Sequence, residues 1–292
     1  MTGSAPRRPR RKVREMEAVV AEVRQETHDT ASLFLDIGDE PRDYEAGQFI
    51  TIDPHQFGFL QQTIAYLEEI KSAREKPRAY SMGSAPHEEH LLITIKEETY
   101  WPGESKYPPV LSPPLARQCP PGTRLEIRGF TGPYTLSAAA EGTRRILHIC
   151  AGSGIVPNFA LIKHSLHAGD GLRHVLLYSS KTKGDIIYYD DFARLAERHP
   201  DHLEILHCIT REDPAGVEPQ ARRGRIDLEL IESCIDPAES MVYCCGPGVL
   251  PWERKEARER GEEPEPKFVE NMMAILAGLG IEDKRIKRES WG

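Results

Sequence analysis

Short runs in which apolar and polar residues alternate dominate the first half of the chain. Such runs, bounded by turn residues, are typical of half-buried β-strands. One segment, residues 57–76, instead has a helical period, which places Phe59, Leu60, Ile64, Leu67 and Ile70 on one side. The first half therefore predicts a small antiparallel β-barrel. Its strands are expected at residues 17–23, 30–37, 48–52, 78–81, 91–96 and 124–130, with a hairpin turn at 28–29.

Continuous apolar runs alternate with helical segments in the second half. The run at residues 145–150 is of the kind found in buried parallel strands. This alternation predicts an α/β doubly wound, Rossmann-like domain. Strands are expected at 145–150, 174–178, 203–209 and 241–245, and helices at 157–167, 190–198, 227–233 and 266–279. Residues 252–264 are almost all charged and are expected to form a solvated insertion.

Composition narrows the class of protein. Charged residues make up 29% and hydrophobic residues 39% of the 292, which is typical of a globular chain. The net charge of −8 argues against nucleic acid as a partner. No apolar run approaches the ~20 residues of a membrane span, and the basic start lacks the apolar core of a secretory signal. We therefore expect a cytoplasmic protein with a basic flexible tail at residues 1–13.

The six cysteines do not form a metal or cluster motif. None of them fits a C-x2-C pair or the spacing of a plant-type iron–sulfur cluster. They are expected to be scattered core thiols. The chain then lacks an iron–sulfur relay of its own.

The strand Arg78-Ala79-Tyr80-Ser81 carries the residue types that a flavin needs. Tyr80 can stack on the ring, Ser81 can hydrogen-bond near N5, and the planar fork of Arg78 can pair with a phosphate. Such a tetrad also occurs by chance, so it depends on the rest of the chain. Further on, Ser112 followed by two prolines is expected to cap a short helix.

A glycine-rich turn follows the first strand of the second half. Gly152 and Gly154 let the backbone approach a pyrophosphate at the start of a helix, although Pro157 replaces the third glycine of the usual fingerprint. The next strand ends in hydroxyls and cations that can hold a ribose or a 2′-phosphate, or that form an ordinary polar loop. These residues include Ser180, Lys181 and Lys183.

Another motif, Cys245-Gly246-Pro247, ends the last long strand, where an open α/β sheet places its ligand crevice. A small side chain there leaves room for a flat ring, and a simple buried cysteine is the alternative.

With these motifs in order, the chain from Glu15 to Gly292 resembles the ferredoxin–NADP reductase superfamily. Arg78–Ser81 is similar to its flavin tetrad, and Leu111–Leu115 to the second flavin element, in which a serine-capped helix faces the FAD pyrophosphate. Residues 152–157 and 245–247 are similar to its nicotinamide-nucleotide motifs. The ending Glu289-Ser290-Trp291 is similar to the acidic-plus-aromatic terminus of many members. A frayed polar terminus is the alternative for this last motif.

The chain departs from the family pattern at three places. Pro109 stands where the second flavin element normally has a glycine, so pyrophosphate contacts can be rearranged. The segments 57–76 and 252–264 are longer than in compact members. No fused iron–sulfur domain is expected.

The resemblance implies hydride transfer from NAD(P)H to FAD, followed by one-electron transfer to an acceptor. Tyr80 and Trp291 would cover opposite flavin faces. Ser81, Cys245 and Glu289 would line the transfer site, with Glu289 a possible proton donor. The domains would be an FAD-binding barrel at 14–138 and an NAD(P)-binding domain at 142–292.

The resemblance leaves the acceptor open. We expect a separate one-electron acceptor, a ferredoxin-like protein or an oxygenase component, and a monomer or weak dimer. Reduction of free flavin or ferric chelates is an alternative, and a non-catalytic flavin-binding regulatory subunit is another. Lysines 181 and 183, with no carboxylate directly after the strand ending at Tyr178, favour use of NADPH at least as well as NADH.

Overall fold

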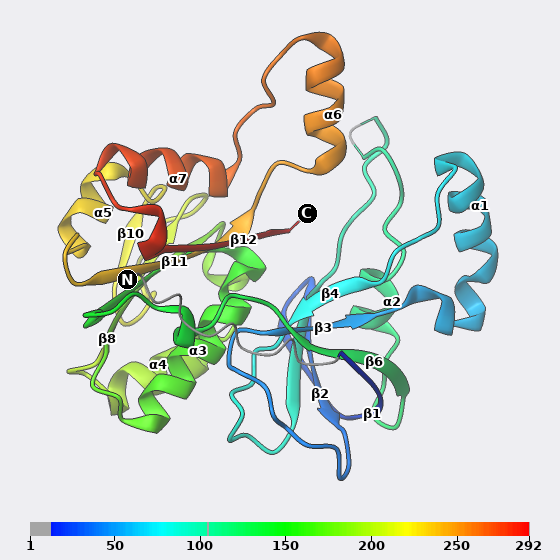
Figure 1. Ribbon diagram of the computed structural model, residues 1–292, viewed down its shortest axis with the longest axis horizontal. Coiled ribbons are helices and arrows are strands. Elements are labelled where there is room, and N and C mark those ends of the chain that lie inside the picture. The colour runs from blue at the N-terminus through cyan, green and yellow to red at the C-terminus, as the bar shows by residue number, and fades with distance from the viewer. Residues whose placement is uncertain (1–12, 104, 292) are drawn as a thin grey trace, which may run out of the picture.

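The computed structural model describes residues 13–103 and 105–291. Six antiparallel strands form the first sheet, in the order β4-β3-β6-β1-β2-β5. A bridge between Met82 and Ile93 joins the two outer strands of this order, so the sheet curls into the expected barrel (Figure 1). The strands are β1 (Arg14–Thr27), β2 (Thr30–Asp36), β3 (Phe49–Ile52), β4 (Arg78–Ser81), β5 (Leu91–Lys96) and β6 (Arg124–Thr131).

Alternation along the strands fills the barrel. In β6, Leu125 and Ile127 are buried, while Arg124, Glu126 and Arg128 are exposed. Helix α2 (Ser112–Arg117) packs Leu115 and Ala116 onto the same core. The helix begins as expected, but the predicted serine cap is wrong: Leu111 precedes the first turn without a side-chain cap, and the Ser112 hydroxyl bonds to Glu98 instead.

Helix α1 (Gln61–Lys71) lies in the segment for which a helical period was expected. The single apolar side predicted for it is only partly correct. Leu60, Ile64 and Leu67 are buried, whereas Phe59 and Ile70 are exposed. Residues 59 and 70 are eleven apart, close to three helical turns, so both fall on the outer face.

The second half contains a parallel sheet in the order β10-β9-β8-β7-β11-β12. Helices α3 (Ile155–Ala168) and α4 (Tyr189–Arg198) share a core with one face of the sheet, and α5 (Leu228–Cys234) and α7 (Phe268–Gly278) with the other. This confirms the doubly wound fold. The strands are β7 (Arg145–Ala151), β8 (Arg173–Ser180), β9 (Leu203–Ile209), β10 (Ala221–Arg223), β11 (Ser240–Pro247) and β12 (Ile286–Trp291).

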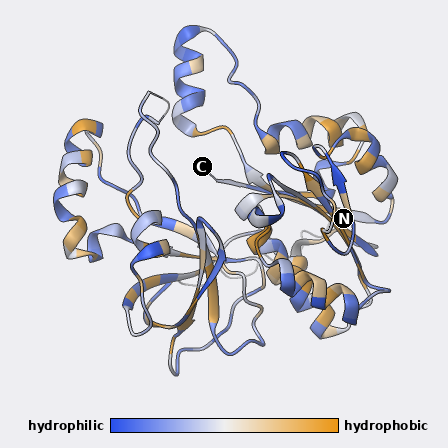
Figure 2. Cartoon of the chain, turned by 180° about the vertical axis from the view of Figure 1, so that it is seen from behind, coloured by the Kyte–Doolittle hydropathy of each residue, from blue (hydrophilic) through white to orange (hydrophobic). Residues whose placement is uncertain are grey.

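Three α-helices or strands of this half were not expected, and the first is the short strand β10, which pairs in parallel with β9. The charged segment forms a helix, α6 (Pro251–Arg260), which stands away from the sheet and is strongly hydrophilic (Figures 1 and 2). The polar end of the chain forms β12, which pairs in parallel with β11 and runs toward the barrel (Figure 1). Pairing with a buried strand, rather than hydrophobicity, orders this terminus.

Three expectations concern composition rather than fold. All six cysteines are free thiols, and five of them are buried. The described helices include none that is long and apolar enough to cross a bilayer. Apart from Val13, the basic tail lies outside the described residues.

Candidate active site

Two adjoining cavities lie where the barrel meets the carboxyl ends of the parallel strands. The larger, of about 860 Å³, lies over the second half, and the smaller, of about 570 Å³, lies against β4 and α2. Four residues line both: Lys96, Ser153, Pro247 and Trp291. The two cavities therefore meet at these four side chains.

The glycine turn forms one wall of the larger cavity. Gly152 has a φ of +53°, and no atom lies within 4 Å of the position that a Cβ would take, so the backbone there is open to a ligand. Gly154 presses against β11 instead, where a Cβ would lie 2.0 Å from the carbonyl oxygen of Cys245. Gly152 thus allows the turn, and Gly154 allows close packing against β11. Helix α3 begins at the next residue, Ile155.

Buried polar side chains hold this turn in place. Tyr178 donates to the Gly152 carbonyl at 3.1 Å, and the Asn158 amide donates to the Gly154 carbonyl at 3.0 Å. The other end of Asn158 bonds to His148 Nδ1 at 2.7 Å. Burial lowers the pKa of His148 to about 3, so this imidazole is neutral near pH 7. His148, within the otherwise apolar strand at residues 145–150, thus helps to hold the turn through Asn158.

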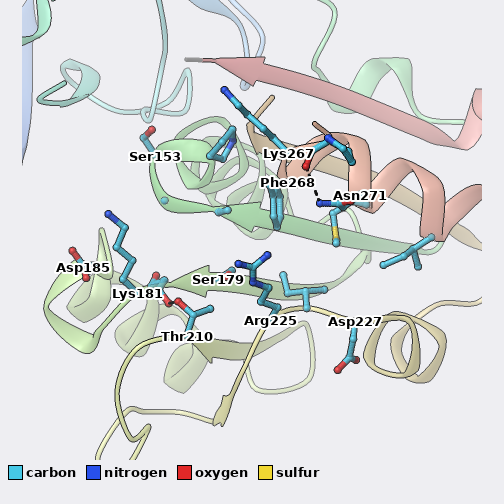
Figure 3. Close-up of a pocket in the computed structure, with 18 of the residues that line it drawn as sticks. Ser153, Ser179, Lys181, Asp185, Thr210, Arg225, Asp227, Lys267, Phe268 and Asn271 are labelled. Carbon is cyan, nitrogen blue, oxygen red and sulfur yellow. Dashed lines mark hydrogen bonds between the residues drawn. The ribbon is translucent and has the colours of Figure 1, made fainter. Parts of the chain in front are cut away.

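The far end of the larger cavity gathers cations and hydroxyls from three loops. Lys181, Thr210 and Arg225 line it (Figure 3). Ser180 also lines this cavity. Lys183 is directed elsewhere: its ammonium donates to the Gly216 carbonyl at 2.6 Å and lies over the ring of Tyr189.

A carboxylate also belongs to this wall. Asp185 lines the cavity and accepts hydrogen bonds from the backbone and hydroxyl of Thr182. No acidic residue directly follows β8 in the sequence, so no carboxylate was expected in this wall. The turn after β8 nevertheless places Asp185 at the cavity.

All four residues of β4 line the smaller cavity. The Arg78 guanidinium is placed by Glu75, which accepts from it at 2.6 Å, and by the Lys76 carbonyl. Burial alone would raise the pKa of Glu75, but bonds from Lys71 and Arg78 outweigh it and lower the pKa. Each Nη atom keeps a second N–H group, and these groups, together with Nε–H, can meet an anion. Tyr80 packs against the barrel core at the same wall.

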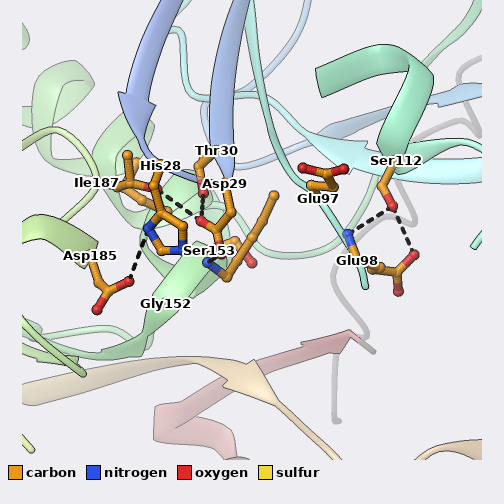
Figure 4. Close-up of polar contacts among 12 residues, drawn as sticks. His28, Asp29, Thr30, Glu97, Glu98, Ser112, Gly152, Ser153, Asp185 and Ile187 are labelled. Carbon is orange, nitrogen blue, oxygen red and sulfur yellow. Dashed lines mark hydrogen bonds and ion pairs between the residues drawn. The ribbon is translucent and has the colours of Figure 1, made fainter. Parts of the chain in front are cut away.

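The start of α2 is less open than expected. The Ser112 hydroxyl donates to Glu98 Oε2 at 3.0 Å and accepts from the Glu98 backbone N–H at 3.2 Å (Figure 4). Glu97 and Glu98 both line the cavity. A phosphate at this end would meet these two carboxylates. Arg78 and Lys96 are the cations that line the cavity, and the Lys96 ammonium is also ion-paired with Asp29.

The last strand delivers Glu289 and Trp291 to the site. Register with β11 sets Glu289 beside Cys245 and Trp291 beside Pro247. Ser81 donates to Glu289 Oε2 at 3.4 Å, across the two halves of the molecule. Burial raises the pKa of Glu289 to about 7, although the Ser81 bond lowers it in part. This carboxyl group can gain and lose a proton near neutral pH.

Other predicted residues have buried positions. Cys245 is completely buried, and this burial raises the pKa of its thiol far above the usual range. Gly246 packs under Phe268, where a Cβ would lie 2.6 Å from the ring, and Pro157 is buried in α3. Of the Cys-Gly-Pro motif, Pro247 is the residue that lines both cavities.

The arrangement fits two cofactors. The smaller cavity has aromatic rings from two elements, Tyr80 and Trp291, and a cation, as a flavin with phosphates requires. The larger has an open glycine turn before a helix, as a dinucleotide requires. Sequence reasoning missed Lys96, Thr210 and Arg225. Thr210 and Arg225 closely follow the carboxyl ends of the parallel strands β9 and β10, which is the signal that could have found these two.

Comparison with known proteins places this geometry in context. The family model described as oxidoreductase NAD-binding domain matches residues 148–251. The ferredoxin reductase component of a 3-ketosteroid-9-alpha-monooxygenase from Rhodococcus rhodochrous is 26% identical over 242 residues, covering 80% of this chain and 58% of that protein. An NADPH oxidoreductase from Mycobacterium tuberculosis is 29% identical over 242 residues, covering 81% and 55%. The chain thus spans less than two thirds of the length of these relatives.

Solved structures share the fold over nearly the whole chain. The flavohem-like FAD/NAD-binding domain of a nitric oxide dioxygenase from Vibrio cholerae superposes with a TM-score of 0.68 at 20% identity, covering 95% of this chain and 98% of that one. A ferredoxin NADP+ reductase from Neisseria gonorrhoeae, with bound FAD and NADP, gives 0.66 at 18% identity, covering 94% and 98%.

The barrel, the doubly wound sheet and the matched NAD-binding segment agree with one another and with the order of motifs along the chain. Residues 148–251 thus match an oxidoreductase NAD-binding domain, and the chain has the fold of solved structures that bind FAD and a nicotinamide dinucleotide, as the resemblance implied.

Proposed function

We propose that this protein takes a hydride from NAD(P)H onto FAD and passes the electrons singly to a separate acceptor protein. The observation that carries the proposal is the shared wall of the two cavities, where Ser153, Pro247 and Trp291 line both. FAD supplies the hydride acceptance and the one-electron chemistry when it is bound. The protein supplies binding, alignment and a proton-holding group.

The barrel and the doubly wound half are assigned separate tasks. Residues 14–138 form the FAD-binding domain and residues 142–292 the NAD(P)-binding domain, because every ladder stays within one sheet. Tyr80 and Trp291 line the smaller cavity, where they would hold the two faces of the flavin. Ser81 and Glu289 form a hydrogen-bonded pair beside them. Cys245 supports this site from the buried layer beneath, next to Gly154.

Arg78 is expected to be the main cation for the FAD phosphates. Replacing it with alanine should weaken FAD binding by about 1.5–3 kcal/mol, because charge-assisted hydrogen bonds are lost. Titration of apoprotein with FAD, followed by flavin fluorescence, measures this change. Arg74→Ala is the matched control, since its largely exposed guanidinium lies 3.9 Å from Asp53, away from the residues that line the smaller cavity. A wild-type protein that takes up no FAD would overturn the proposed function.

Lys181 and Arg225 are expected to select NADPH through its 2′-phosphate. Changing either to alanine should raise the KM for NADPH about 10-fold or more, because a charged hydrogen bond is worth about 1.5–3 kcal/mol, and should change that for NADH less than 2-fold. Lys183→Ala is the control, because its ammonium is bound to Gly216. Steady-state kinetics with both coenzymes decides. Equal losses with NADPH and NADH would show that these cations do not read the phosphate.

The acceptor is proposed from the relatives. One relative is named as the ferredoxin reductase component of a monooxygenase, and one similar structure is the ferredoxin reductase of carbazole 1,9a-dioxygenase. A ferredoxin-like protein or an oxygenase component is therefore the proposed partner. Rates of NADPH oxidation with a small ferredoxin, free FMN and ferric citrate as acceptors test this. Faster turnover with FMN or ferric citrate than with ferredoxin would instead favour a flavin or ferric reductase.

A further inference from the structure

We propose that Ser153 is a positioning residue that holds the Trp291 indole at the junction of the two cavities and thereby sets how readily this ring yields to nicotinamide. The inference rests on the proposed function, because it concerns the same site. The supporting contact joins residues 138 positions apart: Trp291 Nε1 donates to Ser153 Oγ at 3.0 Å.

Ser153 is well suited to this task because its backbone is fixed on both sides. The carbonyls of Gly152 and Gly154 accept hydrogen bonds from Tyr178 and Asn158. The hydroxyl of Ser153 thus sits at a defined place in the turn, half-buried between the two cavities.

Trp291 is held from its own side as well. Its backbone pairs in register with Pro247 in β11, and its ring packs against the cluster that includes Tyr134, Tyr243 and Cys245. The hydrogen bond to Ser153 therefore links two fixed elements and orients the ring. This bond connects the end of β12, which carries the ring, to the glycine turn, which would face the coenzyme phosphates.

Moving the Trp291 indole therefore costs the free energy of its hydrogen bond to Ser153. Nicotinamide must enter where the two cavities join, and the indole N–H then loses its acceptor. A hydrogen bond of this kind contributes a factor of about 2 to 12 to an equilibrium. Ser153→Ala is therefore expected to tighten NADP+ binding by about 2- to 12-fold. Ser153→Thr keeps the hydroxyl and should restore the wild-type affinity.

The competing role for Ser153 is direct contact with a coenzyme phosphate. Calorimetry with 2′-phospho-ADP-ribose, which is NADP+ without its nicotinamide ring, separates the two roles. If Ser153 positions the indole, Ser153→Ala leaves the affinity for this compound within about 2-fold, since no ring is displaced. Weaker binding of both nucleotides by Ser153→Ala would overturn the inference and make Ser153 a phosphate ligand.

A second measurement needs no coenzyme. The chain has three tryptophans, so Trp101→Phe/Trp252→Phe leaves Trp291 as the sole indole. Adding Ser153→Ala to this variant should red-shift the emission and increase acrylamide quenching, whereas Ser153→Thr should not. In a Trp291→Phe background, which lacks the N–H, Ser153→Ala should change NADP+ affinity no further.

The outcomes separate this inference from the proposed function. Unchanged emission and unchanged NADP+ affinity in Ser153→Ala, with normal binding by the wild type, overturn the role of Ser153 alone. A wild-type protein that binds neither NADP+ nor 2′-phospho-ADP-ribose overturns the proposed function, even if the emission still reports the contact between Ser153 and Trp291.

Discussion

Replacing Glu289 with glutamine is expected to slow NADPH-dependent turnover at pH 6 by about 100-fold or more, because a positioned acid–base group typically contributes 10²–10⁴-fold. Glu289 is the carboxyl group that touches Ser81 at the junction of the two halves. It is mostly buried, and this burial raises its pKa to about 7. The group is thus protonated in a substantial fraction of molecules at neutral pH, unlike an ordinary surface glutamate.

The pH dependence follows from that pKa. Below about 7 the carboxyl group carries its proton and can donate it, and above about 7 it is a carboxylate and cannot. Turnover of the wild type should therefore fall about 10-fold for each pH unit above 7, and Glu289→Gln should abolish this limb of the profile. Steady-state rates from pH 5.5 to 9 provide the measurement. Activity that rises through pH 7, or an unchanged limb in the variant, would contradict a donor role.

Stability gives an independent readout for the same residue. Because the folded pKa of about 7 lies above the ordinary 4.5, the folded state resists loss of this proton. The resulting destabilisation is absent below pH 4.5, grows between 4.5 and 7, and is complete above 7. Glu289→Gln should then raise the free energy of unfolding at pH 8, by up to about 3 kcal/mol, relative to its effect at pH 4.5. Glu282→Gln, an exposed carboxylate before β12, is the matched control in both experiments.

Hydrophobic pattern was sufficient to predict the two sheets. Strands such as β6 and β7 bury apolar residues with the expected periods, and most helices of the second half lie close to their predicted ranges. The pattern was insufficient for β12. Its residues are polar, and it is ordered by backbone pairing with β11, which no local sequence signal reveals.

The candidate site was predictable where one short motif provides the chemistry. The tetrad at residues 78–81 lines the smaller cavity, and Gly152 and Ser153 of the glycine turn line the larger one. Sequence could not show that Glu75 pairs with Arg78 or that Glu98 takes the Ser112 hydroxyl. The sequence also could not show that Lys181 lines the cavity while Lys183 does not. The turn that follows β8 directs the Lys183 ammonium to the Gly216 carbonyl instead.

Removing the Trp291 ring is expected to have a larger effect on coenzyme binding than removing the hydrogen bond that orients it. The indole lines both cavities and packs on the buried cluster beneath, so nicotinamide must displace a whole aromatic ring. Trp291→Ser should tighten NADP+ binding by about 10- to 150-fold, because the energy consumed in moving a large, partly buried apolar side chain, about 1.5–3 kcal/mol, is no longer spent. Calorimetric titration of the FAD-loaded variant measures this affinity.

Tighter binding carries a kinetic consequence. Without the Trp291 ring to compete for the site, NADP+ should dissociate more slowly. The kcat with NADPH should therefore fall if product release limits turnover. Discrimination between NADPH and NADH should also narrow, since the 2′-phosphate contacts no longer have to drive ring displacement. Trp101→Ser, which removes an indole that is 60% exposed, is the control and should leave both quantities unchanged. If Trp291→Ser binds NADP+ like the wild type and keeps its coenzyme preference, the terminal ring does not occupy the nicotinamide position, and β12 serves only to bring Glu289 to Ser81.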